Sequence, residues 1–127
     1  MDYRQMLDKA KEVSGNAHVP YSKFPVGACL LTENDKVYTG CNFENASYGL
    51  TICAERNAVG SAVAEGEKRY KAIAIYAPKM EKCFPCGACR QVLHEFCSND
   101  GMDIILENEG DMVIYKLCDI FPEGFRL

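Results

Sequence analysis

The sequence predicts an α/β fold in which helices cover both faces of a sheet of five strands. Five short apolar runs alternate along the chain with segments whose apolar residues recur at helical spacing. Several of these runs are apolar at nearly every position, which is typical of strands buried on both faces of a sheet. The length of 127 residues and the absence of a repeat or linker predict a single domain at residues 1–127.

The first half of the chain predicts one helix and a β-hairpin. Residues 2–14 carry apolar side chains three or four positions apart, as in an amphipathic helix, and the connection at 15–25 contains two prolines. The runs VGACLL at 26–31 and VYTGCNF at 37–43 predict two strands, which the turn TENDK joins.

Two helices and three strands are expected in the second half. Alanines at four-residue spacing predict a helix that begins at Ala54 and ends near Gly66, and KAIAIYA then predicts a buried strand. An apolar stripe from Cys89 to Cys97 predicts a helix after PCGA. The runs MDIILEN at 102–108 and MVIYKL at 112–117 predict the last two strands.

Composition and charge limit the classes of function. Apolar residues make up 48% of the chain and charged residues 25%, as in soluble globular proteins. The formal net charge of −4 is unfavourable for holding a phosphate backbone by bulk charge, so we expect no nucleic-acid partner. No apolar run approaches the roughly 20 residues of a membrane helix, and the N-terminal residues lack a signal-peptide pattern. These features predict a cytoplasmic protein with no membrane partner.

The eight cysteines are too sparse for a disulfide-dense secreted scaffold. We expect Cys29, Cys41, Cys97 and Cys118 to pack as small hydrophobic residues. The other four include three in the segment CFPCGACRQ at 83–91, which therefore needs a chemical explanation.

The spacing in CFPCGACRQ allows three interpretations. An iron–sulfur site of the bacterial ferredoxin type requires a fourth cysteine where Leu93 stands. A thioredoxin-like redox pair in CGAC needs only two cysteines and leaves the rest of the chemistry unused. The third is a zinc site shared with Cys53, because Cys53 opens one predicted helix and Cys86 and Cys89 open another.

Two facing helix starts would suit such a zinc site. Helix N-termini present unpaired N–H groups and positive potential, which favour thiolates. Three thiolate ligands leave a fourth position open for water, which marks a catalytic site. Glu55, in the first turn after Cys53, is expected to reach that water without being a ligand. His18 and His94 are not expected to bind the metal, and Cys83 is interpreted as a spare thiol.

The sequence Cys-Ala-Glu followed at a distance by Pro-Cys-Gly-Ala-Cys is the signature of zinc base deaminases in its three-cysteine form. A wider pattern comprises four segments in order: PYSKFPVGA at 20–28, TGCNFENASYG at 39–49, CAERNA at 53–58 and PCGACRQVL at 85–93. Together these segments resemble the small zinc-dependent cytidine deaminases, a family of homotetrameric nucleoside deaminases. The resemblance implies a three-layer α/β/α sandwich with a mixed five-stranded sheet, one Zn²⁺ per subunit and a homotetramer.

The resemblance also implies roles for individual residues. The zinc ligands would be Cys53, Cys86 and Cys89, and Glu55 would shuttle protons. The residues that would contact the nucleoside are Phe24, Asn42, Glu44 and the backbone of Ala54, and those that would reach across subunits are Ala46, Tyr48 and Phe125. Asn42 and Glu44 would hold the sugar 3′-hydroxyl, and Phe125 would reach a neighbouring subunit's pyrimidine. Taken alone, Glu44 is more simply a solvated loop carboxylate and Asn42 a turn residue.

Charge balance points to a further residue beside the ligands. Zinc with three thiolates carries a net negative charge, which would weaken its ability to acidify water. Arg56, next to Glu55, is the obvious compensating cation, and Arg90, next to Cys89, is a second candidate. For Arg90, an ordinary surface charge is nearly as good an explanation.

The resemblance implies zinc-dependent hydrolytic deamination of cytidine and 2′-deoxycytidine to uridine and 2′-deoxyuridine, with release of ammonia, in pyrimidine salvage. Blasticidin S deaminases share the zinc motifs, but the NFEN segment favours a free nucleoside. Polynucleotide editing is disfavoured because the chain lacks an evident basic, aromatic-rich channel. A structural zinc site closed by Cys83 is the non-enzymatic alternative, and Glu55 beside an open position argues against it.

Overall fold

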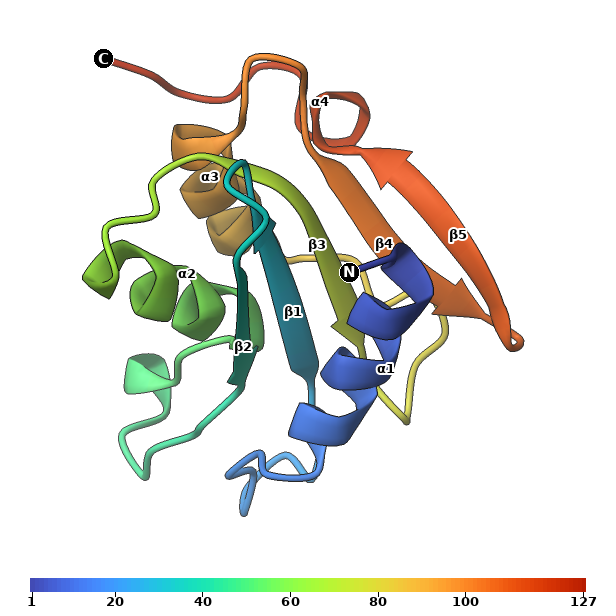
Figure 1. The fold of residues 1–127 in the computed structure, drawn as a ribbon. Coiled ribbons are helices and arrows are strands. Elements are labelled where there is room, and N and C mark those ends of the chain that lie inside the picture. Colours follow the sequence, from blue (N-terminus) through green and yellow to red (C-terminus); the bar gives the residue numbers. More distant parts are fainter.

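The computed structural model describes all 127 residues and contains one mixed sheet with the strand order β2-β1-β3-β4-β5 (Figure 1). The strands are β1 (Gly27–Thr32), β2 (Val37–Cys41), β3 (Tyr70–Tyr76), β4 (Asp103–Asn108) and β5 (Asp111–Lys116). The pair β3 and β4 is parallel, and the other three neighbouring pairs are antiparallel. The expected mixed five-stranded sheet is confirmed.

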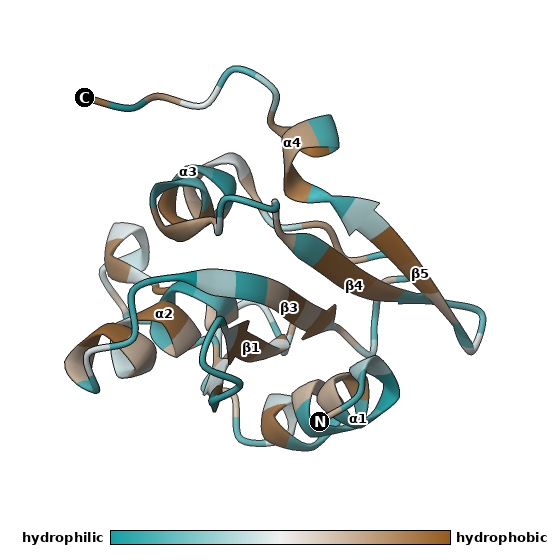
Figure 2. Cartoon of the chain, turned by 45° about the horizontal axis from the view of Figure 1, so that its top comes forward, coloured by the Kyte–Doolittle hydropathy of each residue, from teal (hydrophilic) through white to brown (hydrophobic).

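Helices cover both faces of this sheet. Helix α1 (Tyr3–Ser14) lies on one face, and α2 (Ala54–Ala64) and α3 (Gly87–Phe96) lie on the other (Figures 1 and 2). Side chains of β1 alternate between the layers, since Ala28 and Leu30 join the α2 and α3 core whereas Cys29 and Leu31 join the α1 core. This explains why several strand runs are apolar at nearly every position, as the brown colouring along much of β1, β3 and β4 shows (Figure 2).

Every helix and strand expected from the sequence is present, with shifted ends. Strand β2 stops at Cys41, two residues before the expected end, and Leu117 begins a helix although it was expected to end a strand. The one-turn helices η1 (Tyr48–Leu50) and α4 (Leu117–Ile120) were not expected, because segments this short carry no helical periodicity. None of the helices combines the length and hydrophobicity needed to span a bilayer.

The packing prediction for the four scattered cysteines holds only in part. Cys29 is fully buried against α1, and Cys97 packs at the edge of the α2 and α3 core. The prediction is wrong for Cys118, which is exposed. In the single turn of α4, Leu117 is the buried residue, so the next side chain points away from the core.

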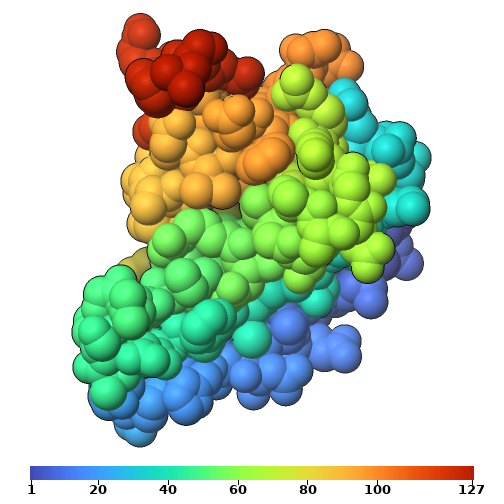
Figure 3. All heavy atoms as spheres, turned by 90° about the vertical axis from the view of Figure 1, so that its left-hand side faces the viewer, coloured from blue at the N-terminus to red at the C-terminus, as the bar shows by residue number.

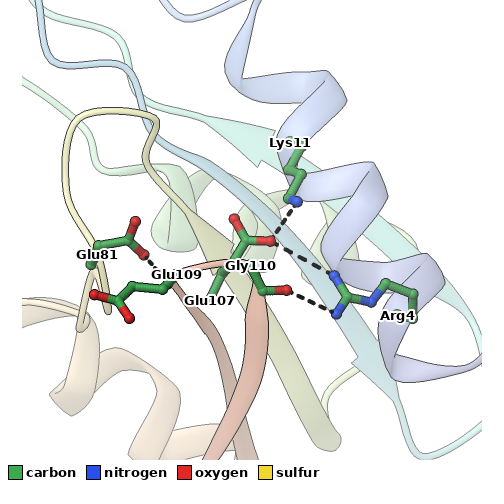
Figure 4. Close-up of polar contacts among 6 residues, drawn as sticks. All are labelled: Arg4, Lys11, Glu81, Glu107, Glu109 and Gly110. Carbon is green, nitrogen blue, oxygen red and sulfur yellow. Dashed lines mark hydrogen bonds and ion pairs between the residues drawn. The ribbon is translucent and has the colours of Figure 1, made fainter.

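An ionic cluster links helix α1 to the C-terminal end of β4. The carboxylate of Glu107 accepts a hydrogen bond from Lys11 Nζ at 2.5 Å and lies 3.7 Å from Arg4 Nη1 (Figure 4). Because the Glu107 side chain is only 14% exposed, solvent screens these contacts less than it would on an open surface.

A second polar link joins α1 to the sheet at Asp103. Tyr3 Oη donates to Asp103 Oδ2 at 2.6 Å, and Lys116 Nζ lies 2.6 Å from Asp103 Oδ1. Burial acts to raise the pKa of the Asp103 carboxyl, but the hydrogen bonds from Lys116 and Tyr3 outweigh burial and lower the pKa overall.

The first residues of α2 pack directly against the end of β2. A Cβ atom added at Gly40 would lie 2.5 Å from both Ala54 O and Ala58 N, so the two backbones approach too closely for any side chain. The amide of Asn57 donates to Cys41 O at 2.6 Å and fixes the same contact. This docking sets the position of the first turn of α2.

Candidate active site

Three cysteine thiols converge between the starts of α2 and α3. Cys53 is the N-cap of α2, Cys86 is the N-cap of α3, and Cys89 lies in the first turn of α3. Their Sγ atoms all lie within 4.8 Å of one another. Neither N-cap thiol makes a capping hydrogen bond to the backbone of its own helix, so both are free to point toward the shared centre.

The donor set fits a zinc ion. Tetrahedral zinc–thiolate bonds of about 2.3 Å place sulfur atoms about 3.8 Å apart, a spacing that this cluster can adopt with small side-chain movements. Both helix N-termini direct positive potential at the centre, which stabilises thiolates. Cys83 is not part of the converging group, and burial raises the pKa of its thiol to about 11. The structure therefore offers three sulfur ligands and no fourth protein ligand.

The guanidinium of Arg56 lies against the thiol cluster. Arg56 Nη2 donates to Cys53 Sγ at 3.4 Å, and Arg56 Nε is buried without a hydrogen-bond partner. Hydrogen bonds from Cys89 and Arg56 lower the pKa of Cys53, whereas the same bond to Cys53, together with burial, raises the pKa of Cys89. A cation bound between the three sulfur atoms would stabilise the thiolate form of all three cysteines.

Glu55 places a buried carboxyl beside the cluster. It lies in the first turn of α2, and only 5% of its surface is exposed. Burial raises the pKa of the Glu55 carboxyl to about 7, and the negative charge of Cys53 adds to the increase. A carboxyl that titrates near neutral pH can both accept and donate a proton during a reaction.

A cavity of about 170 Å³ connects these groups with the loop that follows β2. Cys53, Ala54, Glu55 and Cys86 line one part of its wall, and Asn42 lines another. Three further lining residues were not expected from the sequence: Val26, Thr51 and Phe84. Val26 lies within PYSKFPVGA and Phe84 directly precedes PCGACRQVL, but Thr51 carries no signal of its own.

Comparison with known proteins identifies the family in which this arrangement occurs. Residues 1–101 match the family described as "Cytidine and deoxycytidylate deaminase zinc-binding region". Cytidine deaminase of Sporosarcina psychrophila is 44% identical over 126 residues, which cover 98% of this chain and 92% of that protein. The corresponding protein of Halalkalibacterium halodurans is 42% identical over 98% of this chain and 95% of its own.

The chain belongs to the cytidine deaminase family. A crystal structure of cytidine deaminase from Burkholderia pseudomallei has a TM-score of 0.90 and 41% sequence identity, covering 98% of this chain and 100% of that one. The three-layer fold is thereby confirmed, and the chain is an enzyme that deaminates cytidine. Zinc is its cofactor, and the thiols of Cys53, Cys86 and Cys89 can hold one ion.

The loops beside the cavity place Asn42 and Glu44 of the NFEN segment. Asn42 donates from Nδ2 to Phe24 O and accepts from Val26 N, each at 2.9 Å, so its side chain holds the 24–26 backbone. Glu44 is only 5% exposed, and its Oε1 accepts from the N–H groups of Tyr21 and Ser22 at 3.1 Å each. The simpler interpretation of Glu44 as a solvated carboxylate is therefore wrong.

The charged form of Glu44 is stabilised in spite of burial. Burial acts to raise the pKa of this carboxyl, but hydrogen bonds from Ser22, Tyr21 and Tyr48 lower it overall. The last of these donors is the Tyr48 hydroxyl, 3.4 Å from Glu44 Oε2. Glu44 is therefore an anion at neutral pH and an acceptor for hydroxyl groups.

Five residues expected to contact substrate do not line the cavity within one subunit: the buried Glu44 and four further residues. Phe24 is half-buried, and Ala46, Tyr48 and Phe125 are exposed. Phe125 is held on α3 by two hydrogen bonds between its backbone and the side chain of Gln91. The 41–50 segment packs beside residues 15–25 at one end of the molecule, and the C-terminal residues lie at the opposite end (Figure 3).

Proposed function

We propose that this chain, as one domain spanning residues 1–127, hydrolyses cytidine and 2′-deoxycytidine to uridine and 2′-deoxyuridine with release of ammonia. The observation that carries the proposal is the buried Glu55 carboxyl beside three converging thiols, two of which line the same cavity as Glu55. The physiological setting we propose is pyrimidine salvage in the cytoplasm.

Proton transfer in this reaction is assigned to Glu55. Zinc, when bound, acts as a Lewis acid that makes a water molecule nucleophilic near neutral pH. Glu55 takes a proton from the attacking water and delivers it to ring N3 as the water oxygen bonds to C4. Glu55 then moves the second proton of the water to the amino group, the C4–N bond breaks, and ammonia leaves. The raised pKa of about 7 suits a group that must change its protonation state twice.

Nucleoside recognition is assigned to the loop that follows β2, where Asn42 lines the cavity, and to the 24–26 segment that Asn42 holds. Asn42 retains one N–H and one lone pair beyond its bonds to the 24–26 backbone, and we propose that these and Glu44 hold the 3′-hydroxyl of the sugar. Phe24 is proposed to line the nucleoside pocket, and the backbone of Ala54 to meet the amino group. Because these contacts do not involve the 2′-hydroxyl, the deoxynucleoside is expected to be a substrate.

The assembly we propose is a homotetramer with shared active sites. Four aromatic or aliphatic side chains near the nucleoside loops are about half exposed: Tyr21 at 54%, Phe43 at 46%, Tyr48 at 56% and Leu50 at 63%. Exposed apolar side chains on neighbouring loops favour contact with another subunit. Ala46, Tyr48 and Phe125 are proposed to reach neighbouring subunits' sites.

The direct test follows the absorbance change of cytidine and 2′-deoxycytidine, and the release of ammonia, with the purified zinc-loaded protein. Both nucleosides should be consumed, and a strong chelator should abolish turnover until zinc is restored. A zinc-loaded protein that leaves both nucleosides unchanged would refute the proposed reaction. Light scattering of the same sample tests the tetramer, since a monomer would contradict the shared site.

A further inference from the structure

The segment at residues 83–85 forms part of the cavity wall and leads directly into the zinc-ligand position Cys86. Cys83 and Phe84 line the cavity, and Pro85 is buried. The backbone of these three residues makes a single hydrogen bond within the protein, in which Pro85 O accepts from Arg90 Nε at 2.7 Å. The placement of the wall therefore depends on one side chain of α3.

Arg90 fixes that segment to two other parts of the fold. Its Nη1 donates to Ile120 O, at the end of α4, also at 2.7 Å. Its guanidinium lies 5.9 Å from the ring centroid of Phe84, and that ring packs edge-on against Tyr115 of β5, with centroids 4.9 Å apart. The guanidinium can make these contacts simultaneously because its donors are held in a rigid planar fork.

The sequence left open whether Arg90 compensates the negative charge of the thiol cluster or is an ordinary surface charge. These contacts support neither role. The hydrogen bonds of its side chain go to two main-chain carbonyl groups, so Arg90 does not donate to a thiol. It is also half-buried, which is unlike an ordinary surface charge. Arg56 alone supplies a guanidinium contact to the cluster.

We propose that Arg90 is a positioning residue for deamination, which acts through Pro85 and Phe84 to hold the Cys86 thiol and the adjoining cavity wall in place. This proposal rests on the proposed function of the cavity. Arg56, and not Arg90, donates to the thiol cluster. Removal of Arg90 should therefore affect metal retention and KM without shifting the pH dependence of turnover. Replacing a residue that orients a metal ligand without binding the metal typically costs about 10–100-fold in metal affinity or activity.

The experiment compares Arg90→Gln and Arg90→Lys with the matched control Arg69→Gln. Arg69 also donates to a main-chain carbonyl, Cys97 O at 3.3 Å, but on the exposed surface away from the cavity. Zinc affinity is measured by chelator competition, ligand geometry by the visible spectrum of the cobalt(II)-substituted protein, and turnover by KM and a pH–rate profile.

For Arg90→Gln we expect zinc affinity about 10–100-fold lower, an altered cobalt spectrum and a raised KM, with an unshifted pH–rate profile. Arg69→Gln should match the parent protein in all four. Arg90→Lys keeps the charge but cannot reproduce both carbonyl bonds, so it should fall between the two, and it serves if Arg90→Gln does not fold.

Parent-like zinc affinity, cobalt spectrum and KM in both Arg90 variants would overturn the proposal. A shifted pH–rate profile with unchanged KM would also overturn it, because that result indicates an electrostatic role. The metal measurements do not depend on the substrate. If the parent protein deaminates neither nucleoside, the proposed function fails while the affinity and spectrum still decide the role of Arg90.

Discussion

Replacing Gly40 by alanine tests whether the close packing of α2 against β2 positions the active-site residues of α2. The added Cβ would meet Ala54 O and Ala58 N at 2.5 Å, whereas ordinary contact begins at 3.4 Å. Both atoms belong to the helix backbone, so no side-chain rotation relieves the clash. The start of α2 must therefore retreat by about 0.9 Å, if it carries the whole adjustment.

That displacement moves two groups of the site together, because Cys53 and Glu55 flank Ala54. Overpacking a close contact typically costs about 1–3 kcal/mol of folding stability. Misplacing catalytic groups by about 1 Å costs on the order of 10²-fold in rate. Gly40→Ala should therefore lower stability by about 1–3 kcal/mol and turnover by roughly 10²-fold, with weaker zinc retention.

Gly60→Ala is the matched control, because Gly60 lies within α2 and a Cβ there meets no atom within 4 Å. Alanine should stabilise this helical position by about 0.5–1 kcal/mol and leave activity unchanged. Urea unfolding, zinc titration and cytidine turnover are measured for both variants. If Gly40→Ala is as stable and active as Gly60→Ala, the close approach of β2 and α2 does not position the site.

Four further predictions address single groups. Glu55→Gln should retain zinc yet lose about 10²–10⁴-fold in turnover, so near-normal turnover in a zinc-replete sample would contradict the proton shuttle. Cys53→Ala should lose zinc and activity whereas Cys83→Ala keeps both; metal analysis showing the reverse would refute the ligand set. Arg56→Gln should lower turnover more than zinc content, and the loss should shrink as pH rises because higher pH favours deprotonation of the attacking water; a parallel pH–rate profile would exclude this role. The pKa of Asp103 is lowered in the folded state, so ionised Asp103 stabilises the fold at pH values above its unfolded pKa of about 3.9, and this stabilisation is lost as the pH falls. Asp103→Asn should therefore flatten the acid limb of a stability–pH curve measured by urea unfolding.

Local pattern was enough to predict the strands and helices and the placement of Cys53 and Cys86 at helix starts. The strands are continuous apolar runs and the helices are periodic, and both signals arise from neighbours in the sequence. Cys53 and Cys86 each precede a helical pattern, so their placement at helix starts follows from the same local signals. What the sequence alone could not give is the partner of each polar side chain.

Glu44 and Arg90 illustrate that limit. A carboxylate is usually exposed, and Glu44 is buried because backbone N–H groups of Tyr21 and Ser22, more than 20 residues earlier, converge on it. Arg90 stands beside a zinc-ligand position in the sequence, but its partners are carbonyl groups of Pro85 and Ile120. In both cases the side chain's role depends on contacts that form only when distant segments pack.

The N-cap cysteines show what the site costs the fold. An N-cap Ser, Thr, Asp or Asn typically stabilises a helix by about 1 kcal/mol through a hydrogen bond to its first turn. Helix α1 has such a cap, in which Asp2 accepts from Gln5 N at 2.8 Å, whereas neither Cys53 nor Cys86 caps its helix. The same uncapped N–H groups supply the positive potential that favours thiolates. The chain therefore forgoes stabilisation at two helix starts, and the groups left unpaired there are those that make the cluster fit for a cation.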